Sequence, residues 1–393
     1  MFHNIKQLQQ AKLIISAIKK YGGEIRFIGG CVRDALSKRK IKDIDLATTL
    51  LPYQVEEALN NAKIKNIPTG KQFGTISAII NKTAYEITTL RLDLKTDGRK
   101  AEVKYTNDWQ QDALRRDFTF NALSYDIDED KLYDYFNGQE DLNSGIVRFV
   151  GEPEKRVQED YLRIIRYYRF FGIFGKKIDQ SSVYACKKFA NKISNLSAER
   201  KLNEFIKIFK TEHWFKTVSA LYEDNILIDY IGNNPSKNEI TIIKNLHSLK
   251  LQINPILALA ILSSYKAKPV SEILKLSKKQ FNYLDNLINC FHQMEIQSNE
   301  KHLIYKFEKE IYFDSLKIIA ARNKDYNLFD MQFNRYKDWQ IPVFPISGSD
   351  LKKLGFKEGK SLGNHLRELE ESWIKSDFKL TKEQLLEIIK TTL

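Results

Sequence analysis

Two glycines, followed at a short distance by two alternating aspartates, constrain this 393-residue chain more than any other feature. Gly29 and Gly30 precede a helical segment that contains Arg33, and Asp43 and Asp45 follow that segment. Glycines let the backbone approach a phosphate closely, and the first turn of the next helix offers N–H groups and the Arg33 guanidinium to the same anion. The segment therefore predicts a turn that binds a phosphorylated ligand, with Gly30 and Arg33 among its contacts.

The aspartate pair predicts a metal site beside that turn. Asp43 and Asp45 are two residues apart, so on a strand both side chains face the same side. Two such carboxylates commonly hold Mg²⁺ against substrate phosphates. An isolated Asp-x-Asp is nevertheless usually a pair of exposed surface residues without a binding role. Glu86 lies on another predicted strand and is a candidate third carboxylate. We expect it to be an exposed or supporting residue and assign only Asp43 and Asp45 to the metal.

Hydrophobic periodicity divides the chain into an α/β part and an all-helical part. The first part alternates helices and strands, which predicts a small mixed sheet. From about residue 152 the pattern becomes helical, beginning with a helix over 160–171 that is followed by another over 198–209. The expected fold is an α/β head over 1–146, a helical neck over 147–215, and a helical body and tail over 216–393.

Charge and cysteine content restrict the setting in which the chain works. Lys and Arg number 63 against 50 Asp and Glu, a net charge of +13, which favours a polyanionic partner through counterion release. A generally Lys-rich composition is the alternative explanation. The three cysteines form no disulfide or metal framework, and no signal peptide or membrane span is apparent. We expect a cytoplasmic protein, with no membrane association and no protein partner implied.

Four further polar motifs follow the glycine turn. They occupy residues 91–93, 115–123, 159–170 and 197–200, and Glu204 lies just beyond the last. With the first, in this order, they resemble the five motifs of the class II tRNA nucleotidyltransferases, which share the polymerase-β-like superfamily with bacterial poly(A) polymerases. The resemblance spans residues 25–210, about half of the chain.

The resemblance implies that the head is polymerase-β-like and catalytic, that the neck recognises the nucleotide base, and that the body and tail bind tRNA. It also implies a template-independent reaction. Such enzymes add CCA to the 3′ end of tRNA from CTP and ATP, with Mg²⁺ as cofactor, and release pyrophosphate. Asp43 and Asp45 are then the catalytic, metal-binding pair. In the third motif, the resemblance implies that Arg116 contacts the nucleotide. Asp117 and Asn121 either cap the turn or orient the ribose.

The fourth motif places Asp160, Arg163, Arg166 and Arg169 at three-residue intervals. Each interval turns roughly −60° around a helix, so neighbours in the series stay within reach. On spacing alone, a solvated arginine stripe paired with acids is the simpler explanation. The resemblance implies instead that Asp160 and Arg163 template the incoming base, and that Arg166 and Arg169 face phosphate or the base stack.

Three alternatives stay open at this point. Poly(A) polymerases share the head motifs, but the segment 68–76 is similar to the tRNA-type pattern, in which Gly-Thr begins a strand. Enzymes that add only CC or only A to tRNA differ in details that one sequence does not expose. A catalytically silent RNA-binding protein is disfavoured, because a binding module gains nothing from two carboxylates facing RNA.

Overall fold

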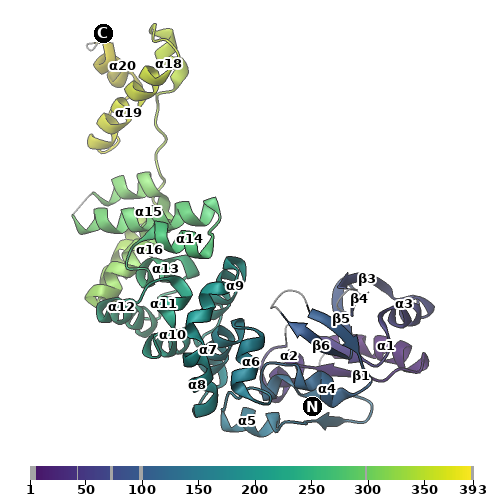
Figure 1. Ribbon diagram of the computed structural model, residues 1–393. Coiled ribbons are helices and arrows are strands. Elements are labelled where there is room, and N and C mark those ends of the chain that lie inside the picture. The colour runs from purple at the N-terminus through teal and green to yellow at the C-terminus, as the bar shows by residue number, and fades with distance from the viewer. Residues whose placement is uncertain (1–5, 42, 71–73, 97–100, 297–298, 391–393) are drawn as a thin grey trace. The chain divides into compact units, whose positions relative to one another are not determined.

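The computed structural model describes residues 6–41, 43–70, 74–96, 101–296 and 299–390 (Figure 1). The chain divides into two compact units, Met1–Tyr230 and Ile231–Leu393. The predicted boundaries after residues 146 and 215 both lie inside the first unit, and they stay predictions. Across the described part of the chain, every helix is too short or too polar to cross a bilayer.

The first unit begins with a seven-stranded mixed sheet in the order β3-β4-β5-β2-β1-β8-β9. β2 pairs with β5 in parallel, and the other neighbours pair antiparallel. A separate hairpin joins β6 and β7. The strands are β1 Ile25–Ile28, β2 Asp45–Thr48, β3 Lys65–Gly70, β4 Thr75–Ile80, β5 Thr83–Thr89, β6 Arg91–Thr96, β7 Ala101–Tyr105, β8 Ser124–Asp126 and β9 Lys131–Tyr133.

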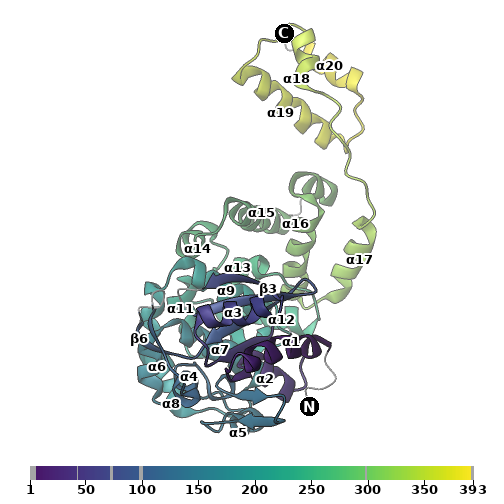
Figure 2. The same ribbon diagram turned by 90° about the vertical axis from the view of Figure 1, so that its right-hand side faces the viewer.

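The core of the head lies between this sheet and its helices. α1 Lys6–Lys20 and α3 Pro52–Asn61 lie side by side against it (Figure 2). The Pro52 ring fixes φ in the first turn of α3, where its missing N–H costs no hydrogen bond. Fully buried apolar side chains from helix and sheet, such as Phe27 and Val55, form one cluster. Their burial fixes the position of β1, which is followed by the glycine turn. It also fixes β2, which begins at Asp45.

Helices complete the first unit. Those before the neck are α2 Gly30–Leu36, α4 Trp109–Leu114, the 3-10 helix η2 Thr119–Asn121 and α5 Gly138–Ser144. Those that follow are α6 Pro153–Glu159, α7 Leu162–Phe174, α8 Gln180–Lys188, the 3-10 helix η3 Ala190–Asn195, α9 Ala198–Phe209, α10 Trp214–Glu223 and α11 Ile226–Ile231. Gly172 lets α7 and α10 pack closely, because a Cβ there would lie 1.9 Å from the Thr217 hydroxyl oxygen.

Aromatic side chains join the third motif to the neck helix α7. Phe118 stacks on Phe149 with ring centroids 5.0 Å apart and meets Phe170 of α7 edge-on at 5.3 Å. Phe120 also meets Phe170, at 5.6 Å. Such pairs add to the stabilisation that burial itself provides. This packing holds α7 against the sheet side of the first unit.

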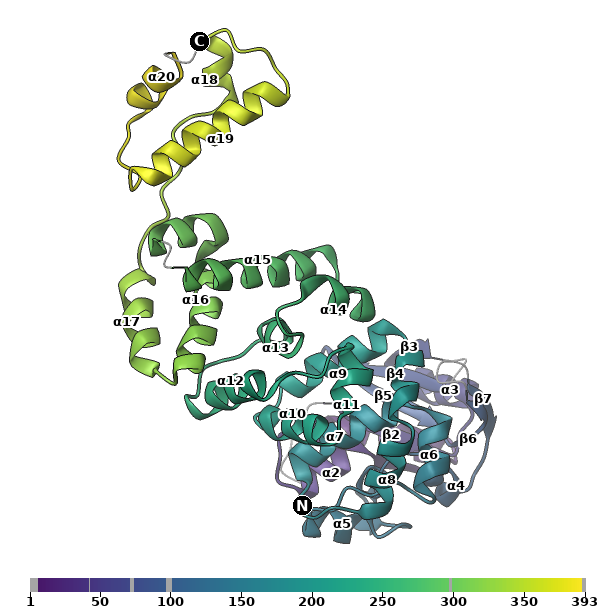
Figure 3. The ribbon, with the colours of Figure 1, turned by 60° about the vertical axis from the view of Figure 1, so that its left-hand side comes forward.

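In the described residues of the second unit, the regular elements are all helices (Figure 3). α16 bends at Glu308, whose φ of 68° lies outside the helical region. A separate apolar cluster around Leu351 and Trp373 joins the last three helices. The helices are α12 Lys237–Ser248, α13 Pro255–Leu262, α14 Ala267–Leu274, α15 Lys278–Glu295, α16 Glu300–Asn323, α17 Tyr326–Tyr336, α18 Gly348–Lys353, α19 Lys360–Lys375 and α20 Lys382–Lys390.

The predicted class, an α/β head followed by an all-helical region, is confirmed. One local prediction is wrong. The helix expected from residue 160 begins at Leu162, because Asp160 has an extended backbone (φ −157°, ψ 104°) and separates α6 from α7. Its carboxylate instead accepts a hydrogen bond from the Leu162 N–H at 3.1 Å. This is the way a polar residue satisfies free N–H groups at a helix start.

Candidate active site

The glycine turn after β1 is shaped by close approach to the third motif. Gly29 has φ +66° and ψ −124°, a conformation that residues with a side chain rarely adopt. A Cβ on Gly29 would also lie 3.0 Å from a guanidinium nitrogen of Arg116. The Gly29 N–H donates to the Leu123 carbonyl at 3.1 Å. The turn and Arg116 are therefore adjacent, and Gly30 opens α2 beside them.

The two aspartates lie at the start of β2. Asp43 is exposed and precedes the strand, and Asp45 is its first residue, opposite Glu86 of β5 in the parallel register. Burial, then the charges of Glu86 and Asp43, raise the pKa of Asp45, while Arg116 counteracts them. Asp45 thus lies close enough to two other carboxylates for their charges to act on it, and Arg116 offsets part of that repulsion.

A cavity of about 650 Å³ brings these elements together. Both aspartates line it, and so does the glycine turn. Of the residues predicted from the sequence, the cavity is lined by Gly30, Arg33, Asp43, Asp45, Arg116, Arg166 and Arg169. Asp160 and Arg163 are not among the lining residues.

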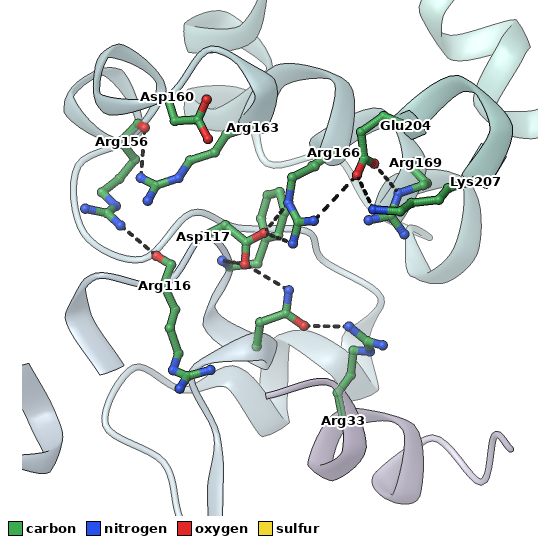
Figure 4. A network of polar contacts seen from close by, with 12 residues as sticks. Arg33, Arg116, Asp117, Arg156, Asp160, Arg163, Arg166, Arg169, Glu204 and Lys207 are labelled. Carbon is green, nitrogen blue, oxygen red and sulfur yellow. Dashed lines mark hydrogen bonds and ion pairs between the residues drawn. The ribbon is translucent and has the colours of Figure 1, made fainter. Parts of the chain in front are cut away.

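The arginines of α7 are held by two carboxylates from other segments (Figure 4). Arg166 donates through Nε to Asp117 at 2.7 Å, and its Nη1 lies 3.8 Å from Glu204 of α9. Arg169 donates to Glu204 at 2.8 Å, and so does Lys207 at 2.9 Å. Glu204 has only 2% of its side chain exposed, so it is a buried charge whose cost is offset by these cations.

Asp117 connects this group to the head. Burial alone would raise its pKa, but the Arg166 charge and the Asn121 amide bring the pKa of Asp117 down to about 2. Asn121 donates to Asp117 at 2.9 Å, and its amide oxygen accepts from Arg33 at 2.6 Å. Arg33 is in turn paired with Asp34 at 2.7 Å. A continuous polar chain therefore runs from α2 through η2 to α7 and α9.

Asp112 of α4 holds both arginines of the third motif. Its carboxylate lies 2.8 Å from Arg115 and 3.2 Å from Arg116. Burial opposes ionisation of Asp112, but the charges of Arg116 and Arg115 outweigh it and lower the pKa. Arg156 of α6, which is 8% exposed, donates to the Arg115 and Arg116 carbonyls at 2.6 and 2.8 Å. These contacts fix the backbone from which Arg116 reaches the glycine turn.

Asp160 and Arg163 lie near each other (Figure 4), and their side chains have separate partners. Arg200 of the fifth motif donates to Asp160 at 2.7 Å. Arg163 donates to Glu159 at 2.8 Å and to the Arg156 carbonyl at 2.9 Å. The pairing with acids expected from spacing alone is present, but the arginines are not solvated, since Arg163 and Arg169 each have only 12% of the side chain exposed.

Sequence reasoning left several residues of this site without a definite role. Asp117 and Asn121 are the central links of the polar chain, and Glu204 is the carboxylate that holds Arg169. Arg156 was not singled out at all. Its signal in the sequence was an i,i+3 pair with Glu159 directly after the helix-starting Pro153. Such pairs are common on solvated helices, so the sequence alone does not reveal that Arg156 is buried.

The aspartate pair is a partial metal site by itself. No group of three or more His, Cys, Asp or Glu side chains that could hold a metal ion occurs in the residues that the structure describes. Mg²⁺ usually takes only one or two protein carboxylates and completes its shell with water and substrate phosphates. Asp43 and Asp45, in a cavity that also offers arginines to a phosphate, fit that mode of binding.

Family models match three successive parts of the chain. The poly A polymerase head domain matches residues 25–148. A region described as the probable RNA and SrmB- binding site of polymerase A matches residues 175–229. The putative tRNA nucleotidyltransferase domain 2 matches residues 249–389.

Individual relatives match almost the whole chain. The mitochondrial CCA tRNA nucleotidyltransferase 1 of Homo sapiens is 36% identical over 97% of this chain and 90% of its own length. The CCA-adding enzyme of Staphylococcus epidermidis is 32% identical over 98% of both chains. The crystal structure of the Bacillus stearothermophilus CCA-adding enzyme in complex with CTP has the same fold, with a TM-score of 0.78 at 24% identity over 99% of each chain.

Proposed function

This chain belongs to the CCA tRNA nucleotidyltransferase family, and on that premise we propose that it adds CCA to the 3′ end of tRNA from CTP and ATP, releasing pyrophosphate. The observation that carries the proposal is the shared cavity, in which Asp43 and Asp45 lie with the glycine turn and Arg116. Carboxylates that bind a cation and basic groups that bind phosphates are the two components that phosphoryl transfer needs.

The aspartate pair is the proposed Mg²⁺ site. When bound, Mg²⁺ lowers the pKa of an attacking hydroxyl and neutralises charge on the triphosphate. The charges of Asp43 and Glu86 act on Asp45, and a divalent cation is favoured where several carboxylates lie close together. We assign Asp43 and Asp45 as the ligands and the catalytic pair.

The nucleotide contacts follow from the cavity. The backbone at Gly30 admits the triphosphate, and Arg33 and Arg116 face it from α2 and the third motif. Arg166 and Arg169 form the cavity wall from α7, and their carboxylate partners keep their guanidinium planes fixed. A planar cation held in this way loses little entropy when it meets a phosphate or a base.

Base selection is assigned to Asp160 and Arg163. The Asp160 carboxylate accepts hydrogen bonds from the Leu162 N–H and from Arg200, and a carboxylate can accept about four. It can therefore still accept an exocyclic amino group, which C and A carry and U lacks. Arg163 must exchange one of its internal acceptors, Glu159 among them, for the base.

Replacement of Arg163 by Ala tests the template role. We expect selectivity for CTP and ATP over UTP and GTP to fall by at least about tenfold, because one good hydrogen-bonding contact contributes roughly 1–3 kcal/mol of discrimination. Triphosphate binding should change less, because Arg163 is not part of the cavity lining. Unchanged selectivity would remove Arg163 from the template.

Release of pyrophosphate tests whether the chain is an enzyme. The purified protein is mixed with tRNA lacking CCA, both nucleotides and Mg²⁺, and pyrophosphate is measured. We expect release that requires RNA, nucleotide and Mg²⁺ together, and loss of release in Asp43→Asn. RNA binding with no pyrophosphate under any condition would favour a silent RNA-binding protein.

The cytoplasmic location stays a prediction, since the human relative is named as mitochondrial.

A further inference from the structure

Most cations of the active-site cavity already have carboxylate partners. Arg33 is paired with Asp34 and Arg116 with Asp112. Arg166, Arg169 and Lys207 are held by Asp117 or Glu204, as described above. A cation whose charge is compensated inside the protein attracts a further anion less strongly than a cation with no partner, because the two carboxylates and the anion repel each other.

Three other cations line the same cavity without such a partner. They are Arg39 and Lys40, in the segment between α2 and β2, and Lys210, directly after α9. Within the described ranges, no ion pair to a carboxylate involves any of the three side chains. Lys40 and Lys210 are exposed, and Arg39 is half-buried. The cavity therefore carries three positive charges that no described ion pair compensates.

Arg39 is held in a way that leaves its donors available. Its guanidinium carbon lies 5.5 Å from the ring centroid of Phe174, the last residue of α7, which also lines the cavity. A guanidinium that packs over an aromatic ring uses its face, whereas its five N–H donors point outward in the guanidinium plane. The contact with Phe174 therefore holds Arg39 at the cavity without using its N–H donors.

We propose that Arg39 and Lys210, with Lys40, form a phosphate-binding subsite in the wall of this cavity. The two ligands with the required chemistry are the triphosphate of the incoming nucleotide and the phosphodiester backbone at the 3′ end of the RNA. The proposal rests on the proposed function, because it assigns this subsite to one of that reaction's own substrates.

The test compares two double variants that each remove two positive charges. Arg39→Gln/Lys210→Gln changes the subsite. Lys38→Gln/Lys192→Gln is the matched control, because Lys38 and Lys192 are exposed in the same unit and do not line the cavity. Equilibrium binding is measured separately for tRNA lacking CCA, over a range of salt concentrations, and for CTP with Mg²⁺.

We expect the subsite variant to bind one of the two ligands about tenfold more weakly than the control variant does. If the ligand is the RNA backbone, tRNA binding weakens, and its salt dependence falls by about 0.7 for each lost phosphate contact, the value for single strands. If the ligand is the triphosphate, CTP binding weakens instead. Equal binding of both ligands by the two variants would overturn the subsite.

One further variant and the choice of a binding readout make the outcome unambiguous. Lys210→Gln alone provides the same test if Arg39→Gln disturbs the packing on Phe174, because Lys210 is exposed at the end of its helix. Binding is measured without turnover, so failure of the subsite is separate from failure of the proposed function. The latter would show as wild-type protein that adds no nucleotide.

Discussion

The two units of the chain differ in what they bury. Among the described residues, the first unit buries Arg26, Asp112, Asp126, Asp141, Arg156, Lys201 and Glu204, each less than 9% exposed. In the described part of the second unit, Asp314 is the one charged residue buried to this degree. Its core is otherwise apolar, and its polar residues mostly cap helices, as Ser236, Asn254 and Ser277 do.

Burying a charge costs free energy unless other groups compensate it, so buried charges are not needed to make a helical unit compact. The second unit illustrates this, because helix capping and apolar packing suffice there. In the first unit, Asp117 and Glu204 position the cations around a cavity that contains Asp43 and Asp45. We infer that Asp112, Arg156 and Glu204 are buried because they position residues of the candidate active site, and the following changes test this inference.

The largest effect should come from Asp45→Asn. We expect turnover to fall by about a thousandfold or more, because the cation site loses a ligand. Stability should stay equal or rise slightly, because burial and neighbouring carboxylates disfavour the ionised Asp45, as its raised pKa indicates. Nucleotide incorporation and thermal unfolding are measured on the same preparation. A variant that keeps more than about a tenth of wild-type turnover would contradict the metal assignment.

Glu204→Gln should mainly destabilise the first unit. The substitution leaves Arg169 and Arg166 near a neutral amide, and breaking a buried ion pair costs about 3 kcal/mol. Glu154→Gln is the matched control, because Glu154 pairs with Lys188 at the surface and should contribute less than about 1 kcal/mol. Urea unfolding of both variants gives the comparison. Equal stabilities would show that the buried pair does not hold the unit together.

Low pH should reduce the stability of the first unit, because Asp117 becomes protonated. Its pKa is about 2 in the folded chain against 3.8 for an ordinary aspartate, so its ionised form stabilises the fold. That contribution, about 2 kcal/mol, is complete above about pH 4 and is lost as the pH falls toward 2. The difference in unfolding free energy between wild type and Asp117→Asn should therefore shrink over this range. A difference independent of pH would contradict the pairing with Arg166.

The smallest effect is expected in the second unit. Asp314 accepts from Tyr283 at 2.8 Å and from Lys317 at 2.7 Å, and it also contacts Asn254. Asp314→Asn should cost about 1–2 kcal/mol of stability, because part of this buried network loses an acceptor. Turnover at saturating substrate should stay within about twofold of wild type. A large loss of turnover without unfolding would break the proposed division between the units.

The sequence predicts those features that depend on local signals. The helix 198–209 has the predicted bounds, because apolar periodicity runs through it and Ser197 precedes its first residue. The glycine turn and the aspartate pair, expected beside each other from their short separation in sequence, line one cavity, and their roles stay predictions. In each case, residues close in sequence determine the conformation.

Pairings between distant segments could not be predicted in this way. Arg166 and Asp117 are 49 residues apart, and Arg169 and Glu204 are 35 apart, so no spacing rule links them. The start of α7 was missed because Asp160 fits a helical pattern equally well, and only its contacts to Leu162 and Arg200 show otherwise. The same limit applies to Arg39, whose contact with Phe174 depends on tertiary packing.

The most direct test of the central claim is nucleotide addition to a tRNA that lacks its 3′ CCA, with products sized at single-nucleotide resolution. CTP and ATP are supplied singly and together. We expect three added nucleotides and no more, and only when both are present. A long ladder with ATP alone would contradict the claim and make the chain a poly(A) polymerase, and a halt after two nucleotides, or one A on a CC end, would make it a partial-activity enzyme.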